Sequence, residues 1–92
     1  MTCPIEHDTH AARFTTESDG HLAELGYRLQ DGQLVIEHTG VPAAIGGRGI
    51  AGALVKAALE HARSAGLRVV PACSYAAEYI RRHPEYADLV DA

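Results

Sequence analysis

The chain has few of the residues that would place it in several common protein classes. Its 92 residues contain no tryptophan, one phenylalanine and only two cysteines. Cys3 and Cys73 lie far apart, and no charged-then-apolar leader opens the chain, so a secreted disulfide scaffold is not expected. No apolar run approaches the roughly 18–20 residues of a membrane-spanning helix. These absences favour a soluble protein in the reducing cytoplasm, with no membrane partner.

The chain also lacks a concentration of positive charge. Eight Lys and Arg residues face twelve Asp and Glu residues, for a formal net charge of -4. Nucleic-acid binding is therefore not expected, because counterion release requires a clustered basic surface. A basic protein or an amine remains electrostatically compatible as a partner.

What remains is the composition of one small globular domain. Hydrophobic residues make up 47% of the chain and charged residues 22%, which is typical of a folded domain. We expect residues 1–92 to form a single domain and a monomer. A core this small favours an open cleft over a large internal cavity.

The first part of the chain predicts antiparallel strands over residues 12–17, 21–29 and 34–39. Asp19-Gly20 and Asp31-Gly32 supply the turns between them. Residues 5–10 are expected to be irregular. His7 and His10 within them lack the further ligands of a metal site, so we expect a solvated patch and no metal.

The second part of the chain predicts a helix, a short strand and another helix. Six apolar residues at three- and four-residue steps form one stripe of a helix that Gly66 ends: Ile50, Leu54, Val55, Ala58, Leu59 and Ala62. A strand over 67–73 follows, and a second helix, with apolar Ala76, Ala77 and Ile80, runs from Ser74 to the residue before Pro84.

This order of strand, loop, helix and strand is a βαβ unit. Its crossover should be right-handed, so the strands ending at Thr39 and Cys73 should be parallel neighbours. The predicted fold is α/β (α+β), with a mixed sheet of about four strands and two helices. Ligands of such sheets bind beside the carboxyl ends of the strands, where His38, the loop and Cys73 should meet.

Glycines crowd the loop before the first helix. Gly46, Gly47 and Gly49 would let a ligand approach the helix N-terminal N–H groups, which attract phosphate. The spacing matches neither a P-loop nor the dinucleotide fingerprint. Considered alone, the glycines are equally compatible with a turn that only reverses the chain.

A resemblance favours the phosphate interpretation. Residues 46–51 are similar to the Gln/Arg-x-x-Gly-x-Gly/Ala pyrophosphate loop of the GCN5-related N-acetyltransferases; Gly49 and Ala51 match, and Gly46 replaces the Gln or Arg. Together with residues 38–42, 71–75 and 83–86, this loop makes about residues 10–90 resemble the minimal, single-domain members of that family. The resemblance implies an acetyl-CoA cleft between the two parallel strands.

The resemblance also assigns roles. The loop backbone would hold the pyrophosphate of coenzyme A, the end of the third strand would hold the pantetheine, and the start of the second helix would adjoin both. The implied cofactor-binding residues are Thr39, Gly40, Val41, Gly46, Gly47, Arg48, Gly49, Ile50, Ala51, Ser74 and Tyr75. The implied catalytic residues are His38, as the base, and Cys73, as an acid or a transient acetyl carrier.

Each catalytic candidate has an ordinary structural alternative. A free cysteine is more often a buried small hydrophobe, which is our interpretation of Cys3, and a strand-end histidine is more often a half-exposed polar side chain. The tyrosine acid of larger family members is missing, because the alignment places Ile80 there. Tyr79, one residue away, is expected to pack or to face solvent.

The function implied is that of an acetyl-CoA-dependent N-acetyltransferase acting on an amine, such as a protein lysine or N-terminus. The alternative is a regulatory or interaction module that binds coenzyme A without significant catalysis. The acceptor is not identified by the sequence.

Overall fold

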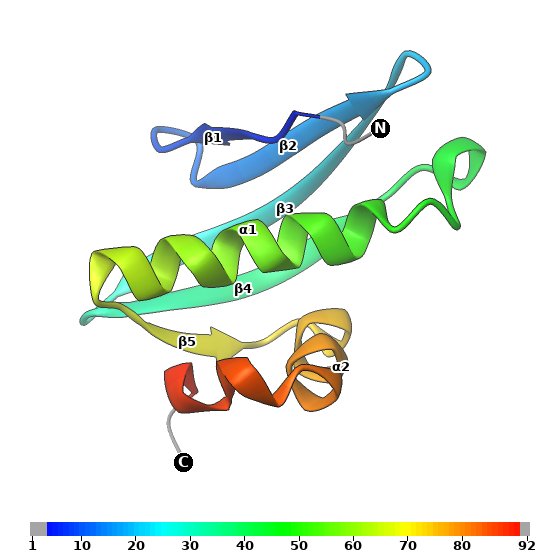
Figure 1. Ribbon diagram of the computed structural model, residues 1–92. Helices are drawn as coiled ribbons and strands as arrows, with labels where there is room; N and C mark the ends of the chain where they lie inside the picture. The colour runs from blue at the N-terminus through cyan, green and yellow to red at the C-terminus, as the bar shows by residue number, and fades with distance from the viewer. Residues whose placement is uncertain (1–3, 91–92) are drawn as a thin grey trace.

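The computed structural model describes residues 4–90, and these form one mixed sheet with a long helix across one of its faces (Figure 1). The five strands lie in the order β1-β2-β3-β4-β5. β1 to β4 are antiparallel neighbours, and β5 runs parallel to β4. The strands are β1 (Glu6–Asp8), β2 (Arg13–Ser18), β3 (His21–Gln30), β4 (Gln33–Gly40) and β5 (Arg68–Pro71). The predicted α/β class and parallel pair are confirmed, with five strands in place of about four.

The additional strand is β1, which lies where we expected irregular chain. His7 is the reason for the error. Its ring stacks on Phe14 with 4.1 Å between ring centroids, and its Nε2 lies 2.5 Å from Tyr27 Oη. His7 is therefore half-buried in an aromatic cluster, and the expectation of a solvated patch is wrong for it; His10 is exposed.

The two hairpins form as their Asp-Gly pairs predict. Asp19 and Gly20 have φ of +51° and +74°, and Asp31 and Gly32 have φ of +51° and +76°. Two successive residues with positive φ give the turn whose twist matches that of paired strands. These turns fix the register of β2 with β3, and that of β3 with β4 as far as the pair Tyr27 and Ile36.

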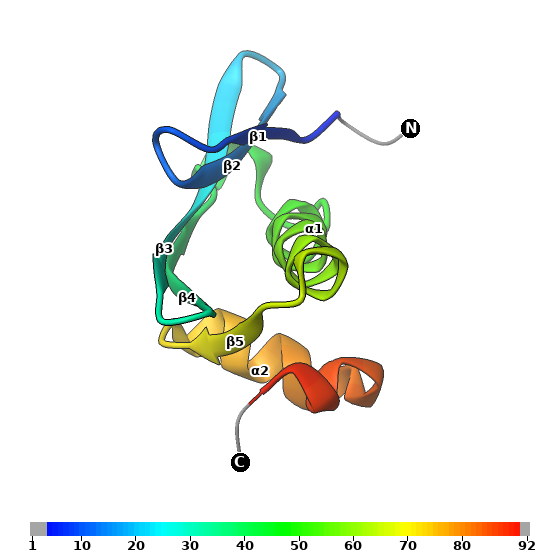
Figure 2. The same cartoon turned by 90° about the vertical axis from the view of Figure 1, so that its left-hand side faces the viewer.

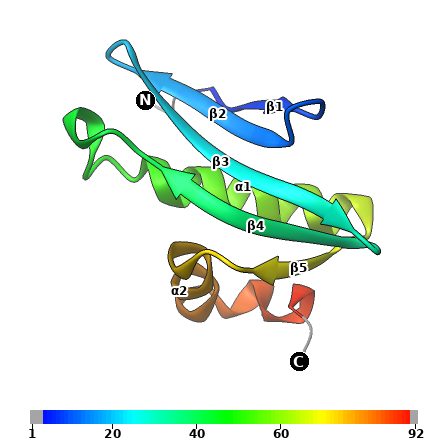
Figure 3. The same ribbon diagram turned by 180° about the vertical axis from the view of Figure 1, so that it is seen from behind.

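The long helix α1 (Ile50–Ala65) buries the same six residues that the apolar stripe predicts. They pack against the inner face of the sheet, where Phe14, Leu25, Tyr27, Leu34 and Ile36 are buried. Figure 2 shows the curved sheet with α1 on one side of it only. Viewed from behind, β3 and β4 lie in front of α1, and no helix of residues 4–90 covers their outer face (Figure 3).

The shorter helix α2 (Ser74–Arg82) lies beside β5 and buries Ala76 and Ile80, while Ala77, expected on the apolar face, is exposed. Two 3-10 helices complete the fold, η1 (Ala43–Ile45) and η2 (Pro84–Leu89). Neither α-helix within residues 4–90 has the length and apolar character needed to cross a membrane.

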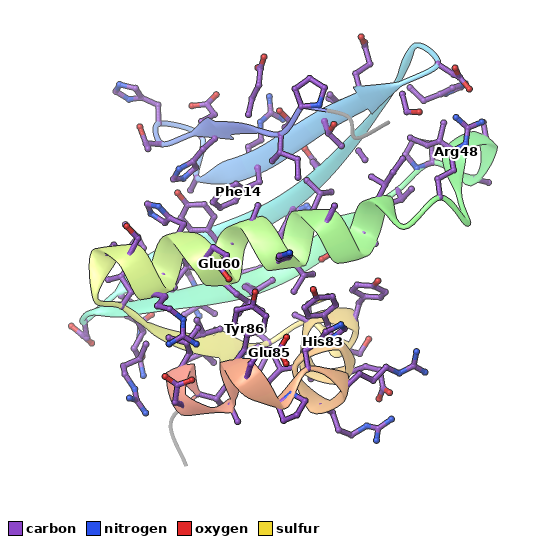
Figure 4. All side chains as sticks on the ribbon, viewed as in Figure 1. Phe14, Arg48, Glu60, His83, Glu85 and Tyr86 are labelled. Carbon is purple, nitrogen blue, oxygen red and sulfur yellow. The ribbon has the colours of Figure 1, made fainter. Side chains whose placement is uncertain are left out.

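Side-chain hydrogen bonds connect helix η2 to α1. Tyr86 Oη donates to Glu60 Oε2 at 2.5 Å, and Figure 4 shows these two side chains directed at one another. Arg63 Nη1 adds an ion pair to Asp88 Oδ2 at 3.0 Å. The hydrogen bond to Glu60 raises the pKa of Tyr86 to about 12, with burial as the second cause.

Candidate functional site

The site begins with an irregularity in β4. Tyr27 pairs with Ile36 and Gly26 with His38, so Glu37 is an extra residue between the two pairs. Such a bulge interrupts the alternation of side chains along a strand. Beyond it, Thr39 pairs with the core residue Leu25 and shares its face, toward α1, whereas His38 lies on the outer face above Gly26.

Strands β4 and β5 separate at this same point. Their parallel ladder ends with the pair Ile36 and Pro71, and a last hydrogen bond runs from the Cys73 N–H to the Ile36 carbonyl oxygen at 3.0 Å. β4 continues to Gly40 alongside β3, while the segment that follows β5 turns into α2. Within residues 4–90, no strand pairs with this last part of β4 on the β5 side.

Cys73 lies where the two strands separate, at the N-cap of α2. Its Sγ is 3.8 Å from Thr39 Oγ1, which places the half-buried thiol against the end of β4. Burial raises the pKa of the Cys73 thiol, but the N–H groups of Ala76 and Tyr75 and the Thr39 hydroxyl together lower it below its usual value. The other cysteine, Cys3, is outside the described residues.

His38 lies on the opposite side of β4 from the Cys73–Thr39 contact. Its side chain is 59% exposed, and its Nε2 lies 3.2 Å from Glu24 Oε1. It borders an open groove of about 290 Å³ on the outer face of the sheet, lined by Ala11, Ala12, Arg13, Glu24, Gly26, Tyr27, Glu37 and His38. His38 and Cys73 thus flank the end of β4 from its two faces.

The glycine loop leads directly into α1. Gly47 and Gly49 have φ of +77° and +76°, and a Cβ on either would meet no atom within 4 Å. Their backbone conformation favours glycine, and the space beside them is open. α1 has no side-chain cap and no acidic residue in its first turn. Its first N–H groups therefore face no capping side chain, which fits the negative charge of a pyrophosphate.

Arg48 anchors the loop. Its Nη1 donates to Asp19 Oδ2 at 2.6 Å and to Ser18 Oγ at 3.1 Å, both at the β2–β3 turn. Figure 4 shows the side chain reaching from the loop toward that turn. The guanidinium thus already has two partners within the protein, so the contribution of this residue to a ligand site would come from its backbone.

The start of α2 packs closely beside the start of α1. A Cβ on Gly52 would lie 3.4 Å from Tyr75 Oη and 3.5 Å from Tyr79 Cε2. Tyr75 is 43% exposed, and its hydroxyl lies beside Gly52 in the first turn of α1. Tyr79 stacks on His83 with 3.9 Å between ring centroids, which confirms that it packs.

Two residues beside His38 were not anticipated from the sequence, Glu24 and Gly26. The available signal was Gly26 itself, because a glycine within a strand often marks the close approach of another group. No comparable signal identified Glu24, since a charged residue on an exposed strand face is ordinary.

Comparison with known proteins gives a consistent picture. The sequence profile of the GCN5-related N-acetyl-transferase family matches residues 13–89. Protein NATD1 of Homo sapiens is 38% identical over 87 residues, which cover 89% of this chain and 77% of that protein. Protein NATD1 of Gallus gallus is also 38% identical over 87 residues and is covered to 79%.

A solved structure shares the fold. The NMR solution structure of a GCN5-like protein from Staphylococcus aureus, proposed to be an N-acetyltransferase, superposes with a TM-score of 0.77 at 31% sequence identity. The match covers 98% of this chain and 89% of that one.

Proposed function

The chain belongs to the GCN5-related N-acetyltransferase family, and from that premise we propose that it is an acetyl-CoA-dependent N-acetyltransferase acting on an amine, such as a protein lysine or N-terminus. The observation that carries the proposal is the separation of β4 from β5 after the pair Ile36 and Pro71, beside the glycine-rich start of α1. This separation leaves an opening beside the edge of β4, the N-terminus of α1 and the Cys73 thiol. Residues 1–92 would act as one minimal domain.

The residues at the opening fit the parts of coenzyme A. The Gly46 N–H donates to the Ala43 carbonyl oxygen at 3.1 Å, so the N–H groups from Gly47 to Ala51 are the ones that would hold the pyrophosphate. The first turn of α1 has no acidic residue to compete with its negative charge. The backbone of Thr39–Val41 offers strand-type hydrogen bonds to the amides of the pantetheine, beyond the end of the β5 ladder. Ser74 and Tyr75, at the start of α2, would close the other side of the opening. When bound, acetyl-CoA supplies the acetyl group as an activated thioester.

His38 would take the proton of the attacking amine from the outer face of the sheet. Its exposure leaves the ring open to an acceptor from solvent, and an imidazole is suited to accept a proton near neutral pH. The amine would thus enter from the side opposite to α1, through the groove that His38 borders.

Cys73 would act on the thiol side of the same reaction. The N–H groups at the start of α2 and the Thr39 hydroxyl stabilise its thiolate. That environment serves either a proton donor to the departing sulfur or a transient acetyl carrier. A thioester on Cys73, trapped by rapid acid quenching after brief exposure to acetyl-CoA without acceptor, would identify the carrier role.

Two measurements test the proposal. Calorimetric titration with coenzyme A and acetyl-CoA should show binding. Mass spectrometry should detect acetylated products when acetyl-CoA is supplied with a lysine-containing peptide, a peptide with a free N-terminus or spermidine. Binding without acetylation of any amine, and with no effect of His38→Ala or Cys73→Ala on biological activity, would favour a non-catalytic coenzyme A module. No binding at all would refute both functions.

A further inference from the structure

The outer face of the sheet holds an arrangement around His38 that the family resemblance does not assign. The bulge at Glu37 places His38 directly opposite Gly26, and Glu24 lies on the same face, two residues along β3. Figure 3 shows this face of β3 and β4 in front. His38 therefore lies among groups from two strands, and each of them constrains the imidazole differently.

Gly26 forms the surface on which the imidazole lies. A Cβ on Gly26 would overlap His38 Cε1 and lie 2.9 Å from Nδ1. Gly26 does not have a positive φ, so its backbone conformation does not require glycine. Glycine is unfavourable within a strand, where it offers no side chain to pack. What the glycine provides is room for the ring of His38.

Glu24 fixes the other edge of the ring. Its Oε1 lies 3.2 Å from His38 Nε2, and its Oε2 accepts a hydrogen bond from Arg13 Nη1 at 3.0 Å. The hydrogen bond to His38, followed by that to Arg13, lowers the pKa of the Glu24 carboxyl. An ionised carboxylate accepts only, so the hydrogen in this contact belongs to Nε2. In the neutral ring the lone pair is then on Nδ1.

We propose that Glu24 and Gly26 are the positioning residues of His38: Glu24 holds the Nε2–H tautomer, and Gly26 provides the space in which the ring is held. This inference rests on the proposed function. The step it serves is balanced within the reaction. The amine nitrogen bonds to the acetyl carbon, the carbon–sulfur bond breaks with its electrons on sulfur, and the amine proton passes to Nδ1. The carboxylate of Glu24 then stabilises the imidazolium that forms.

An exposed ion pair alone would contribute little, so the test must separate positioning from surface charge. Glu37→Gln is the matched control. Glu37 lines the same groove and adjoins His38 in sequence, but its carboxylate pairs with Arg28 Nε at 3.0 Å. Glu24→Gln and Glu37→Gln therefore remove the same charge from the same groove, and only the first removes the charged partner of His38.

The kinetic experiment uses acetyl-CoA and a lysine-containing peptide as probes. Glu24→Gln should lower kcat about tenfold or more with unchanged affinity for coenzyme A. Glu37→Gln removes a charge from the groove through which the amine would enter, so its effect should fall on the KM of the peptide and not on kcat. Gly26→Ala should also lower kcat, while its thermal stability is not reduced, because the exposed imidazole can swing away from the methyl group. Equal kcat for the two Gln variants, or wild-type kcat in Gly26→Ala, would overturn the proposal.

A readout independent of activity distinguishes this inference from the proposed function. Long-range ¹H–¹⁵N correlation spectra at about pH 8.5, where a free imidazole is neutral, report the tautomer of each histidine. The His38 signals, identified by their loss in His38→Ala, should show the Nε2–H form in the wild type and a mixture in Glu24→Gln. A predominant Nδ1–H form in the wild type would refute the positioning role even in an active enzyme. The expected tautomer in a protein that acetylates no amine would support the geometry and reject the function.

Discussion

Replacing Gly49 with leucine tests the glycine loop directly. Gly49 is the N-cap of α1 with φ of +76°, and a Cβ there would meet no atom within 4 Å. The substitution therefore creates no clash in the free protein. It does place a side chain in the open space in front of the helix N-terminus, where a pyrophosphate would have to approach. We expect the fold to survive and the binding of coenzyme A to be lost.

The cost to stability can be separated from the loss of binding because α1 has a glycine with positive φ at each of its two ends. Gly66, its C-cap, has φ of +72° and equally open surroundings. A non-glycine residue in this conformation costs about 1–2 kcal/mol at either end. Each kcal/mol lowers the Tm of a domain this size by about 4–8 °C. Gly49→Leu and Gly66→Leu should thus lose similar stability.

Coenzyme A binding should distinguish the two leucine variants. Loss of even one charge-assisted contact should weaken coenzyme A binding at least tenfold, which corresponds to about 1.4 kcal/mol. Calorimetric titration should therefore show this loss for Gly49→Leu and wild-type affinity for Gly66→Leu. Gly49→Ala, with the same backbone strain and less bulk, should lie between them. Wild-type affinity in a folded Gly49→Leu protein, or equal losses in both leucine variants, would refute the loop assignment.

Three further predictions concern other residues. Cys73 should react with iodoacetamide at pH 7 faster than an unperturbed cysteine, because its pKa is lowered, and acetyl-CoA should protect it; equal rates with and without acetyl-CoA would make it a packing residue. His38→Ala should lower turnover by about 100-fold with little change in coenzyme A affinity, and a variant that keeps the wild-type rate and pH profile would remove His38 from the mechanism. Tyr86→Phe should cost about 1 kcal/mol in chemical denaturation, through the lost hydrogen bond to Glu60. Since folding raises the pKa of Tyr86 to about 12, its contribution is present below about pH 10 and lost as the pH rises toward 12, a loss that Tyr86→Phe should lack.

The elements that could be predicted from the sequence are those with strong local signals. The six buried residues of α1 recur at helical spacing, and Gly66 adopts the left-handed conformation that ends the helix. The Asp-Gly pairs specify their turns by backbone conformation alone. The parallel pairing of β4 and β5 followed from the handedness of a βαβ crossover, which needs only the order of elements.

β1 could not be predicted because its stability comes from contacts remote in sequence. Three residues are too few to show an alternating pattern, and both neighbours of His7 in the strand are exposed acids. The strand is held by the ring of His7 on Phe14 and by its contact with Tyr27, which lie on β2 and β3. No property of residues 5–10 alone indicates those partners.

The site shows the same division between local and remote information. The order of residues along the chain was enough to predict a cysteine at the start of one helix and glycines before the other. It was not enough to predict on which side of the sheet His38 lies. Strict alternation would place His38 with Leu34 and Ile36 toward α1, where a polar ring would need a buried partner. The extra residue Glu37 moves His38 to the outer face and moves Thr39 to the face of Leu25, toward Cys73.

One bulged residue thus determines which chemistry each face of β4 can supply. On the α1 side it places a hydroxyl within 3.8 Å of the thiol, and on the outer face it places an imidazole within 3.2 Å of a carboxylate. The same irregularity coincides with the end of the β4–β5 ladder, because Ile36 is both the last residue before the bulge and the last to pair with β5. A donor held in the opening and an acceptor approaching from the outer face would therefore meet at one point of the strand. Because the bulge arises from the register between β3 and β4, residues of both strands, including Gly26 and Glu24 of β3, contribute to the geometry of the site.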